Sequence, residues 1–296
     1  MRGAPLRRPT AGCTHDEVAP AGRVGVNLDS MPQPTTKAPD AVAQVGSLFL
    51  HSLTQVGAMG VLLGRIAARM VRFDFDYDEL MRSLYRMGVR SLPIVVITAI
   101  FTGGIMVIQA APVVERYGAY GLLGWGAGFG ILREIGPLLV ALMISGRVGA
   151  NNTAELGTMV VTEQVDALRA LAIDPISFLL VPRFAGIVVT LFLSTVFAVG
   201  LALVGAAYVG WGLLGVAPMV FYQGLTGGLL GVSDLFHGLL KSVAFGLIIA
   251  LSSCQFGIST SGGAPGVGRS VNATVVVSAM GVFVLDYVVS FAYGGS

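Results

Sequence analysis

The sequence carries little charge. Only 11% of its 296 residues are Asp, Glu, Lys or Arg, against about 25% in soluble globular domains. Hydrophobic residues make up 54%, and the mean hydropathy is +0.80. This balance excludes a soluble fold and predicts an all-α polytopic membrane protein. The net charge of only +2 gives no support to nucleic-acid binding.

Residues that commonly build active sites are also scarce. The two cysteines, Cys13 and Cys254, lie far apart, which argues against a structural disulfide. The three histidines are scattered and lack the spacing of a metal site. Neither of the two lysines, Lys37 and Lys241, follows the glycine pattern of a phosphate-binding loop. We therefore expect no catalytic residue, metal or cofactor in this chain; if ATP drives it, ATP and Mg bind to a separate subunit.

Residues 1–40 are rich in Pro, Gly, Ala and Thr and lack the apolar core of a secretory signal. Such a composition cannot bury enough apolar surface to fold, so we predict a disordered tail. A plastid transit peptide is the alternative. We favour the tail because transit peptides are poor in acids, whereas this segment carries Asp16, Glu17, Asp29 and Asp40.

Residues 41–64 are uncharged and long enough to cross a membrane, yet they carry a polar stripe. Polar side chains recur at helical spacing at Gln44, Ser47, His51 and Gln55. Such a stripe is typical of a helix in the membrane interface, which we favour over a spanning helix.

Residues 65–90 continue these interfacial or elbow helices and hold an excess of positive charge. By the positive-inside rule they lie in the cytoplasm, with the N-terminus. The arginines are Arg65, Arg69, Arg72, Arg82, Arg86 and Arg90, against the acids Asp74, Asp76, Asp78 and Glu79.

Five largely apolar stretches are each long enough to span a bilayer, which takes about 20 residues of helix. Between the third and fourth, residues 208–236 are expected to form an outer loop or a helix at the surface. The glycine-rich residues 257–272 are expected to form a cytoplasmic loop, and the chain ends outside. The predicted spans are about 92–111, 127–146, 184–207, 239–257 and 273–293.

One polar, acidic segment, residues 147–183, separates the second span from the third. Asn152 followed by Glu155 three residues later is typical of a capping box at a helix start. The Asp-Pro pair at 174–175 ends the pattern. The sequence therefore predicts one amphipathic helix over about 153–172.

The acids of this predicted helix, Glu155, Glu163 and Asp166, fall within one arc of the helical wheel. Two interpretations stand side by side. The segment joins two spans and keeps its charges in water, as charge runs usually do. Alternatively, it docks a soluble partner that transmits force into the membrane.

Eight short motifs, met in one order along the chain, resemble the MlaE/YrbE family. These proteins are the permease subunits of ABC transporters associated with MCE proteins. The resemblance begins near residue 80, and we assign residues 41–296 to an MlaE-type permease domain. The motifs are Leu84–Pro93, Arg133–Pro137, Gly146–Gly149, Ala154–Met159, Thr162–Leu168, Asp174-Pro175, Val181–Arg183 and Gly266–Gly268.

The resemblance implies a permease, not an enzyme, that moves lipid between the bacterial inner membrane and an MCE protein. Phospholipid is the default substrate, with sterol and fatty acid as alternatives, and the direction of transport stays open. The implied partners are a second copy in a homodimer, an MlaF-like cytoplasmic ATPase, an MlaD-like MCE protein on the periplasmic side, and membrane lipid. The implied location is the inner membrane, with a cytoplasmic N-terminus.

In this picture the polar helix is the coupling helix, which receives force from the ATPase. Glu163 and Asp166 are the residues expected foremost at that contact. The full predicted set is Glu155, Glu163, Gln164 and Asp166, flanked by Arg147 and Arg183.

Charged residues inside the spans form a second candidate site. Glu134 is expected either to pair structurally with Lys241 or Arg133, or to line an outward-facing lipid cavity with them. In such a cavity the cations would attract a phosphate head group. The resemblance favours the cavity. Tyr117, an amphipathic residue suited to the membrane interface, is expected at its mouth.

Asp286 lies inside the last span. Such an acid is more often protonated or satisfied by its neighbours than used in a proton relay, and we expect the same here.

Two other functional classes stand as alternatives to the ABC permease. A stand-alone secondary transporter or channel for a hydrophobic solute is favoured by internal repeats, and an intramembrane enzyme needs a catalytic constellation. The sequence offers no convincing example of either.

Overall fold

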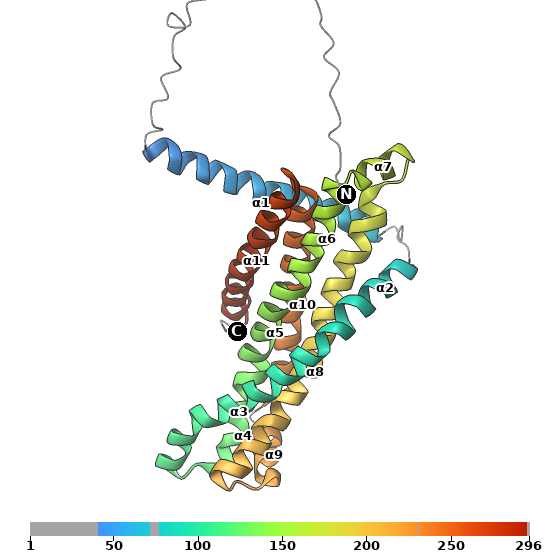
Figure 1. The fold of residues 1–296 in the computed structure, drawn as a ribbon. Helices are drawn as coiled ribbons and strands as arrows, with labels where there is room; N and C mark the ends of the chain where they lie inside the picture. The colour runs from blue at the N-terminus through green and yellow to red at the C-terminus, as the bar shows by residue number, and fades with distance from the viewer. Residues whose placement is uncertain (1–40, 72–76, 229, 295–296) are drawn as a thin grey trace, which may run out of the picture. The chain divides into compact units, whose positions relative to one another are not determined.

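A computed structural model describes residues 41–71, 77–228 and 230–294, and within these ranges it contains helices and turns but no strand. The chain divides into two compact units, residues 1–50 and 51–296. The description of the first unit begins with helix α1 (Ala41–Val71), so the tail predicted over residues 1–40 lies outside the described residues. The other helices belong to the second unit (Figure 1).

Within the described residues, five helical stretches of the second unit are long and apolar enough to cross a membrane. Each contains one predicted span, so the all-α polytopic class is confirmed. The interfacial position of α1 stays a prediction. The stretches are Asp78–Tyr117, Tyr120–Val161, Ile176–Leu214, Val232–Ile258 and Gly263–Tyr293.

Several stretches consist of shorter helices that follow one another directly. The first stretch contains α2 (Tyr77–Gly88), η2 (Val89–Ser91) and α3 (Leu92–Tyr117). The second contains η3 (Tyr120–Leu122), α4 (Leu123–Gly130), η4 (Ile131–Ile135), α5 (Gly136–Ile144), η5 (Ser145–Gly149) and α6 (Ala150–Val161), and the third contains η6 (Ile176–Leu180) and α8 (Val181–Leu214). The fourth and fifth are the single helices α10 (Val232–Ile258) and α11 (Gly263–Gly294). Short helices α7 (Gln164–Ala170) and α9 (Pro218–Thr226) stand between stretches.

Three of these elements, η4, η5 and η6, are single π-helical turns. A π-turn inserts an extra residue into the helical ladder and turns the following side chains to a new face, often at a functional position. Here η4 carries Arg133 and Glu134, and η5 carries Arg147. The candidate residues of the second span therefore lie where its helix departs from regular geometry.

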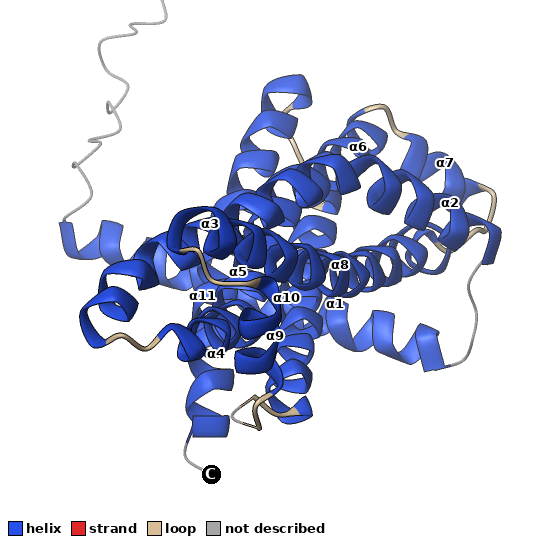
Figure 2. Cartoon of the chain, turned by 90° about the horizontal axis from the view of Figure 1, so that it is seen from below, coloured by secondary structure: helices blue, strands red, loops and turns tan. Residues whose placement is uncertain are grey.

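Helices α3 and α8 lie side by side with their backbones in contact (Figure 1). A Cβ atom on Gly103 would stand 1.8 Å from the carbonyl oxygen of Ala202, and one on Gly205 would stand 2.3 Å from that of Ile100. Small residues permit such an approach between spanning helices. On its other sides α8 packs against α2 and α10, and Figure 2 shows α8 next to α10 inside the second unit.

The prediction of one polar helix over 153–172 is wrong. Helix α6 continues the second span through this region, and α7 is a separate helix. Asn152 is buried inside a helix instead of capping one, and it donates a hydrogen bond to Ser253 Oγ at 2.9 Å. A polar residue satisfied by a neighbouring helix does not mark a helix start, which is why the capping pattern misled.

The cytoplasmic loop predicted over 257–272 is also largely helical. Helix α11 begins at Gly263, and Gly262 and Gly263 both adopt positive φ, which allows the chain to turn sharply before it. Arg269 consequently lies on a helix. In the region 208–236, α8 continues to Leu214, α9 is a short helix and α10 begins at Val232; the position of α9 at the membrane surface stays a prediction.

The contact between α3 and α8 predicts unequal effects of one methyl group at two glycines of α8. Gly205→Ala should destabilise the protein by about 1–3 kcal/mol, because the methyl group meets a carbonyl oxygen. Gly200→Ala is the matched control, since nothing lies within 4 Å of its Cβ position and alanine favours helix. Thermal unfolding in detergent measures both; equal melting temperatures would contradict the close contact.

Candidate functional site

An ion cluster around a buried lysine joins the second, fourth and fifth spans. The Lys241 side chain is 0% exposed, and its Nζ donates to Glu134 Oε2 at 2.6 Å. The same Nζ forms an ion pair with Asp286 Oδ1 at 2.8 Å. Glu134 Oε1 also accepts a hydrogen bond from Ser290 Oγ at 3.3 Å. Thus η4, α10 and α11 meet at one ammonium group.

A glycine lets α10 come close enough for this contact. Gly238 stands one turn before Lys241, and a Cβ there would lie 2.0 Å from the carbonyl oxygen of Leu132 on η4. Any side chain at this position would push α10 away from η4. The short distance from Lys241 to Glu134 therefore depends on glycine at 238.

The cluster selects between the pairings considered for Glu134. Glu134 pairs with Lys241, whereas Arg133 pairs with Asp234, 3.6 Å away, and stands over the ring of Phe129 at 5.3 Å from its centroid. The pairing of Glu134 with Arg133 is therefore wrong. Lys241 has no exposed surface, so in this conformation it cannot touch a lipid head group, whereas Arg133 and Glu134 are partly exposed; the cavity stays a prediction.

The structure also shows where two other residues named from the sequence, Asp286 and Tyr117, lie. Asp286 Oδ1 forms an ion pair with Lys241 at 2.8 Å but makes no hydrogen bond with the described residues, and this pairing agrees with the interpretation that neighbours neutralise the acid. Tyr117 lies at the C-terminal end of α3 with 74% of its surface exposed, and it makes none of the polar contacts described for the cluster. The structure therefore does not bring Tyr117 to Lys241, and its place at a cavity mouth stays a prediction.

The polar segment after α6 is a tight helical hairpin. Glu163 takes a left-handed conformation with φ of 60°, and Ala172 does so with φ of 59°. These two turns bracket α7, which is anchored by the buried side chain of Val165. Arg69 of α1 forms an ion pair with Asp174 at 2.9 Å, just beyond the hairpin.

The hairpin presents three of the predicted coupling residues to the surroundings. Glu163, Gln164 and Asp166 are all exposed. Asp166 forms an ion pair with Arg169 at 2.9 Å, but both side chains stay mostly accessible, and such surface pairs are weak. Acidic groups at this tip are therefore available to a partner.

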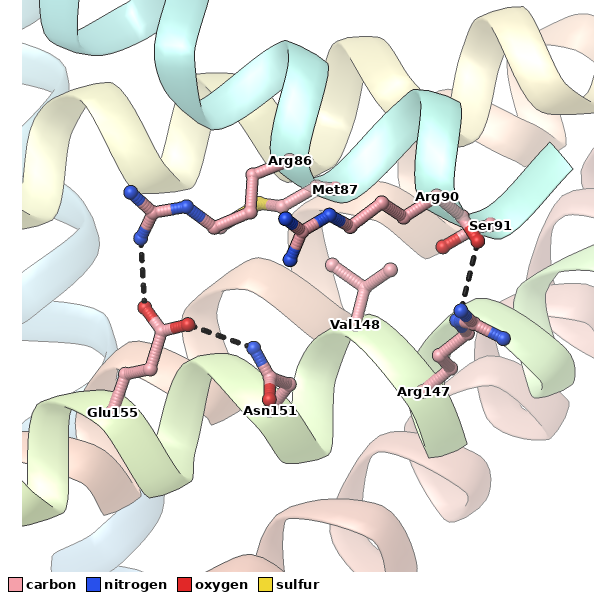
Figure 3. A pocket seen from close by; sticks show the side chains of 8 residues that line it. All are labelled: Arg86, Met87, Arg90, Ser91, Arg147, Val148, Asn151 and Glu155. Atoms are coloured by element: carbon pink, nitrogen blue, oxygen red, sulfur yellow. Dashed lines mark hydrogen bonds and ion pairs between the residues drawn. The ribbon is translucent and has the colours of Figure 1, made fainter.

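Glu155 and Arg183 are not surface groups of the hairpin. The Arg183 side chain is only 4% exposed and donates to Glu155 Oε2 at 2.9 Å. Glu155 also accepts from Asn151 at 2.8 Å and from Arg86 at 3.4 Å, as Figure 3 shows. This network links α2, α6 and α8, so Arg183 does not flank a coupling helix on the surface as predicted.

Sequence reasoning missed two partners in these networks. Asn152 accepts a hydrogen bond from Arg183 at 3.2 Å, although the sequence suggested a helix cap. The link from Lys241 to Asp286 was not anticipated either. The signal was present, because an acid alone in an apolar span needs a cation, and Lys241 is the one lysine within the spans.

The burial of Lys241 predicts a large loss of stability on Lys241→Met. Two partly exposed carboxylates would then lose their cation, at a cost of about 1–3 kcal/mol, below that of a fully buried pair. Adding Glu134→Gln and Asp286→Asn should recover most of the melting temperature in detergent. An unchanged melting temperature for Lys241→Met alone would show that the cluster does not hold the spans together.

Comparison with known proteins agrees with this architecture. The family model described as Permease MlaE matches residues 80–292. A probable ABC transporter permease protein of Synechocystis is 35% identical over 246 residues, covering 83% of this chain and 86% of its own length. A protein of Arabidopsis thaliana, TRIGALACTOSYLDIACYLGLYCEROL 1, chloroplastic, is 31% identical over 230 residues, covering 78% of this chain and 65% of its own length. A probable ABC transporter permease protein of Rickettsia prowazekii is 34% identical over 252 residues, covering 83% of this chain and 95% of its own length. The chain belongs to the MlaE family of ABC transporter permeases.

Proposed function

We propose that this permease moves lipid, with phospholipid as the expected substrate, between a bacterial inner membrane and an MCE protein. The observation that carries the proposal is the exposed acidic hairpin around α7 on a chain whose sequence lacks a phosphate-binding loop. An ABC permease works with an ATPase, and this hairpin offers that partner a contact. We assign Glu163, Gln164 and Asp166 to it.

A hairpin of this kind can pass force into the membrane because it continues a span. Helix α6 runs from η5 to Val161 and bears the hairpin at its end. A push on α7 therefore acts on the same helical stretch that carries Glu134 of the ion cluster. Glu155 and Arg183 stiffen this connection from inside instead of touching the ATPase.

Lipid is favoured as substrate by the kinship and by the nature of the spans. The name of the Arabidopsis relative refers to a glycerolipid, diacylglycerol carrying galactose. In this chain, the charged groups of the ion cluster pair with one another in a largely apolar bundle, as expected for a substrate that is itself mostly apolar. The MCE partner rests on the family resemblance.

A second copy of the chain is the expected partner of α11. In the apolar 18-residue segment of this helix only 11% of the residues are buried, against 33–56% in the corresponding segments of the other four stretches. Met280, Val284, Tyr287 and Phe291 follow one another at helical spacing and are all exposed. A homodimer would cover this face and enclose a path between two permeases.

The charge distribution supports an orientation with the hairpin and the N-terminus in the cytoplasm. The elements α2, η2, η5 and α7 together carry five arginines, whereas the end of α3 carries Glu115 and Arg116. Positive charge marks the cytoplasmic side of membrane proteins.

The proposed contact predicts loss of the ATPase on charge reversal. With Glu163→Lys and Asp166→Lys combined, an ABC ATPase should no longer copurify from native membranes, because two attractive acids become repulsive cations. Glu115→Lys is the control, since Glu115 is exposed at the end of α3. The purified complex should transfer lipid between vesicles only with ATP; transfer by the permease alone without ATP would favour a secondary transporter or channel instead.

The orientation predicts which positions an impermeant thiol reagent reaches. In a background with Cys13 and Cys254 replaced by Ser, Tyr117→Cys should react in intact spheroplasts. Gln164→Cys should react only after the inner membrane is opened, because it lies on the hairpin. The reverse pattern would invert the assigned topology.

A further inference from the structure

A pocket rich in arginine opens where the first span begins, on elements other than those of the ion cluster. It has a volume of about 280 Å³ and is lined by side chains of α2, η2, η5 and α6. Arg86, Arg90 and Arg147 contribute to its wall, and Figure 3 shows them around one opening. The buried side chains of Met87 and Val148 close it on the inside.

The pocket carries an excess of positive charge. Glu155 is the one carboxylate among its lining residues, and the buried Arg183 neutralises it from behind at 2.9 Å. Arg147 uses one N–H to bond the carbonyl oxygen of Arg90 at 2.8 Å, which leaves the rest of its guanidinium donors. Within the described residues the guanidinium of Arg90 has no hydrogen-bond or ion-pair partner. The pocket therefore offers donors to an anion.

An apolar stripe leads from the pocket along the first span. Arg86 and Arg90 are followed at helical spacing by Ile94, Ile97 and Phe101 on α3. These apolar side chains are well exposed, with Ile97 at 57% and Phe101 at 68%. Charged donors at the head of an exposed apolar stripe match a molecule with an anionic head and an apolar tail.

We infer that this pocket binds the phosphate of an anionic membrane lipid, with the acyl chains along α3. Guanidinium groups bind phosphate through charge-assisted, often bidentate hydrogen bonds. A soluble anion would use the pocket but not the stripe, so the lipid accounts for both features. The inference rests on the proposed function only for the leaflet, which is the cytoplasmic one in the proposed orientation.

Native mass spectrometry of the full chain in detergent tests this site. We expect the wild-type protein to retain phosphatidylglycerol more strongly than phosphatidylcholine, whose choline offsets the phosphate charge. Arg90→Gln should weaken phosphatidylglycerol binding about tenfold, the effect of losing one hydrogen bond to a charged group. Folding should survive, because no side-chain interaction of Arg90 is lost in the described part of the chain.

Arg116→Gln is the matched control, since it removes the same charge from an exposed position at the opposite end of α3. It should leave phosphatidylglycerol binding unchanged. Equal loss in both variants, or no loss in Arg90→Gln, would overturn the site. Displacement of the lipid by millimolar inorganic phosphate would overturn the assignment to lipid. Because binding is measured without ATP or an ATPase, failure of lipid transport would not alter this result.

Discussion

Lys241 is an ammonium group with no exposed surface in a membrane-spanning helix, and it can be there only if carboxylates meet it. Glu134 and Asp286 do so from two other spans. Because an unpaired charge in hydrocarbon is so unfavourable, this requirement fixes the rotation of three helices about their axes. The π-turn at η4 and the glycine at 238 are the backbone features that let the groups meet.

A second polar network, nearer the end of the bundle, also pairs a buried cation with groups on neighbouring helices. Arg183, buried in α8, is met by Glu155 and Asn152 of α6, and Asn152 in turn reaches Ser253 of α10. Each of these groups would be costly alone in an apolar bundle, and together they are satisfied. The result is that α6 is held as an extension of the second span. The exposed hairpin at its tip is therefore attached to a stiff element, as a contact that transmits force requires.

The two networks also separate residues by role. Glu155 and Arg183 look like parts of one coupling surface in the sequence, but they hold helices together inside the protein. Glu163, Gln164 and Asp166, only a few residues away, stay exposed beyond a left-handed turn. Without Glu155, the proposed contact with an ATPase is a smaller and better defined set of exposed residues. The pairing of Glu155 with Arg183 also leaves the arginine pocket beside Glu155 with its positive character.

The sequence by itself determined the class of the protein, its five spans and its family, because apolar length and short motifs are local properties of the chain. It could not determine where the helices end around Asn152 or Gly263, since a polar or glycine-rich stretch reads as a break until a neighbouring helix satisfies it. It also could not say which cation meets Glu134, because Arg133 and Lys241 were both candidates. Only the tertiary structure decided this. Packing brings Glu134 and Asp286, which lie 107 and 45 residues from Lys241 in the sequence, to its ammonium group, and the burial of Lys241 then favours its pairing with these acids.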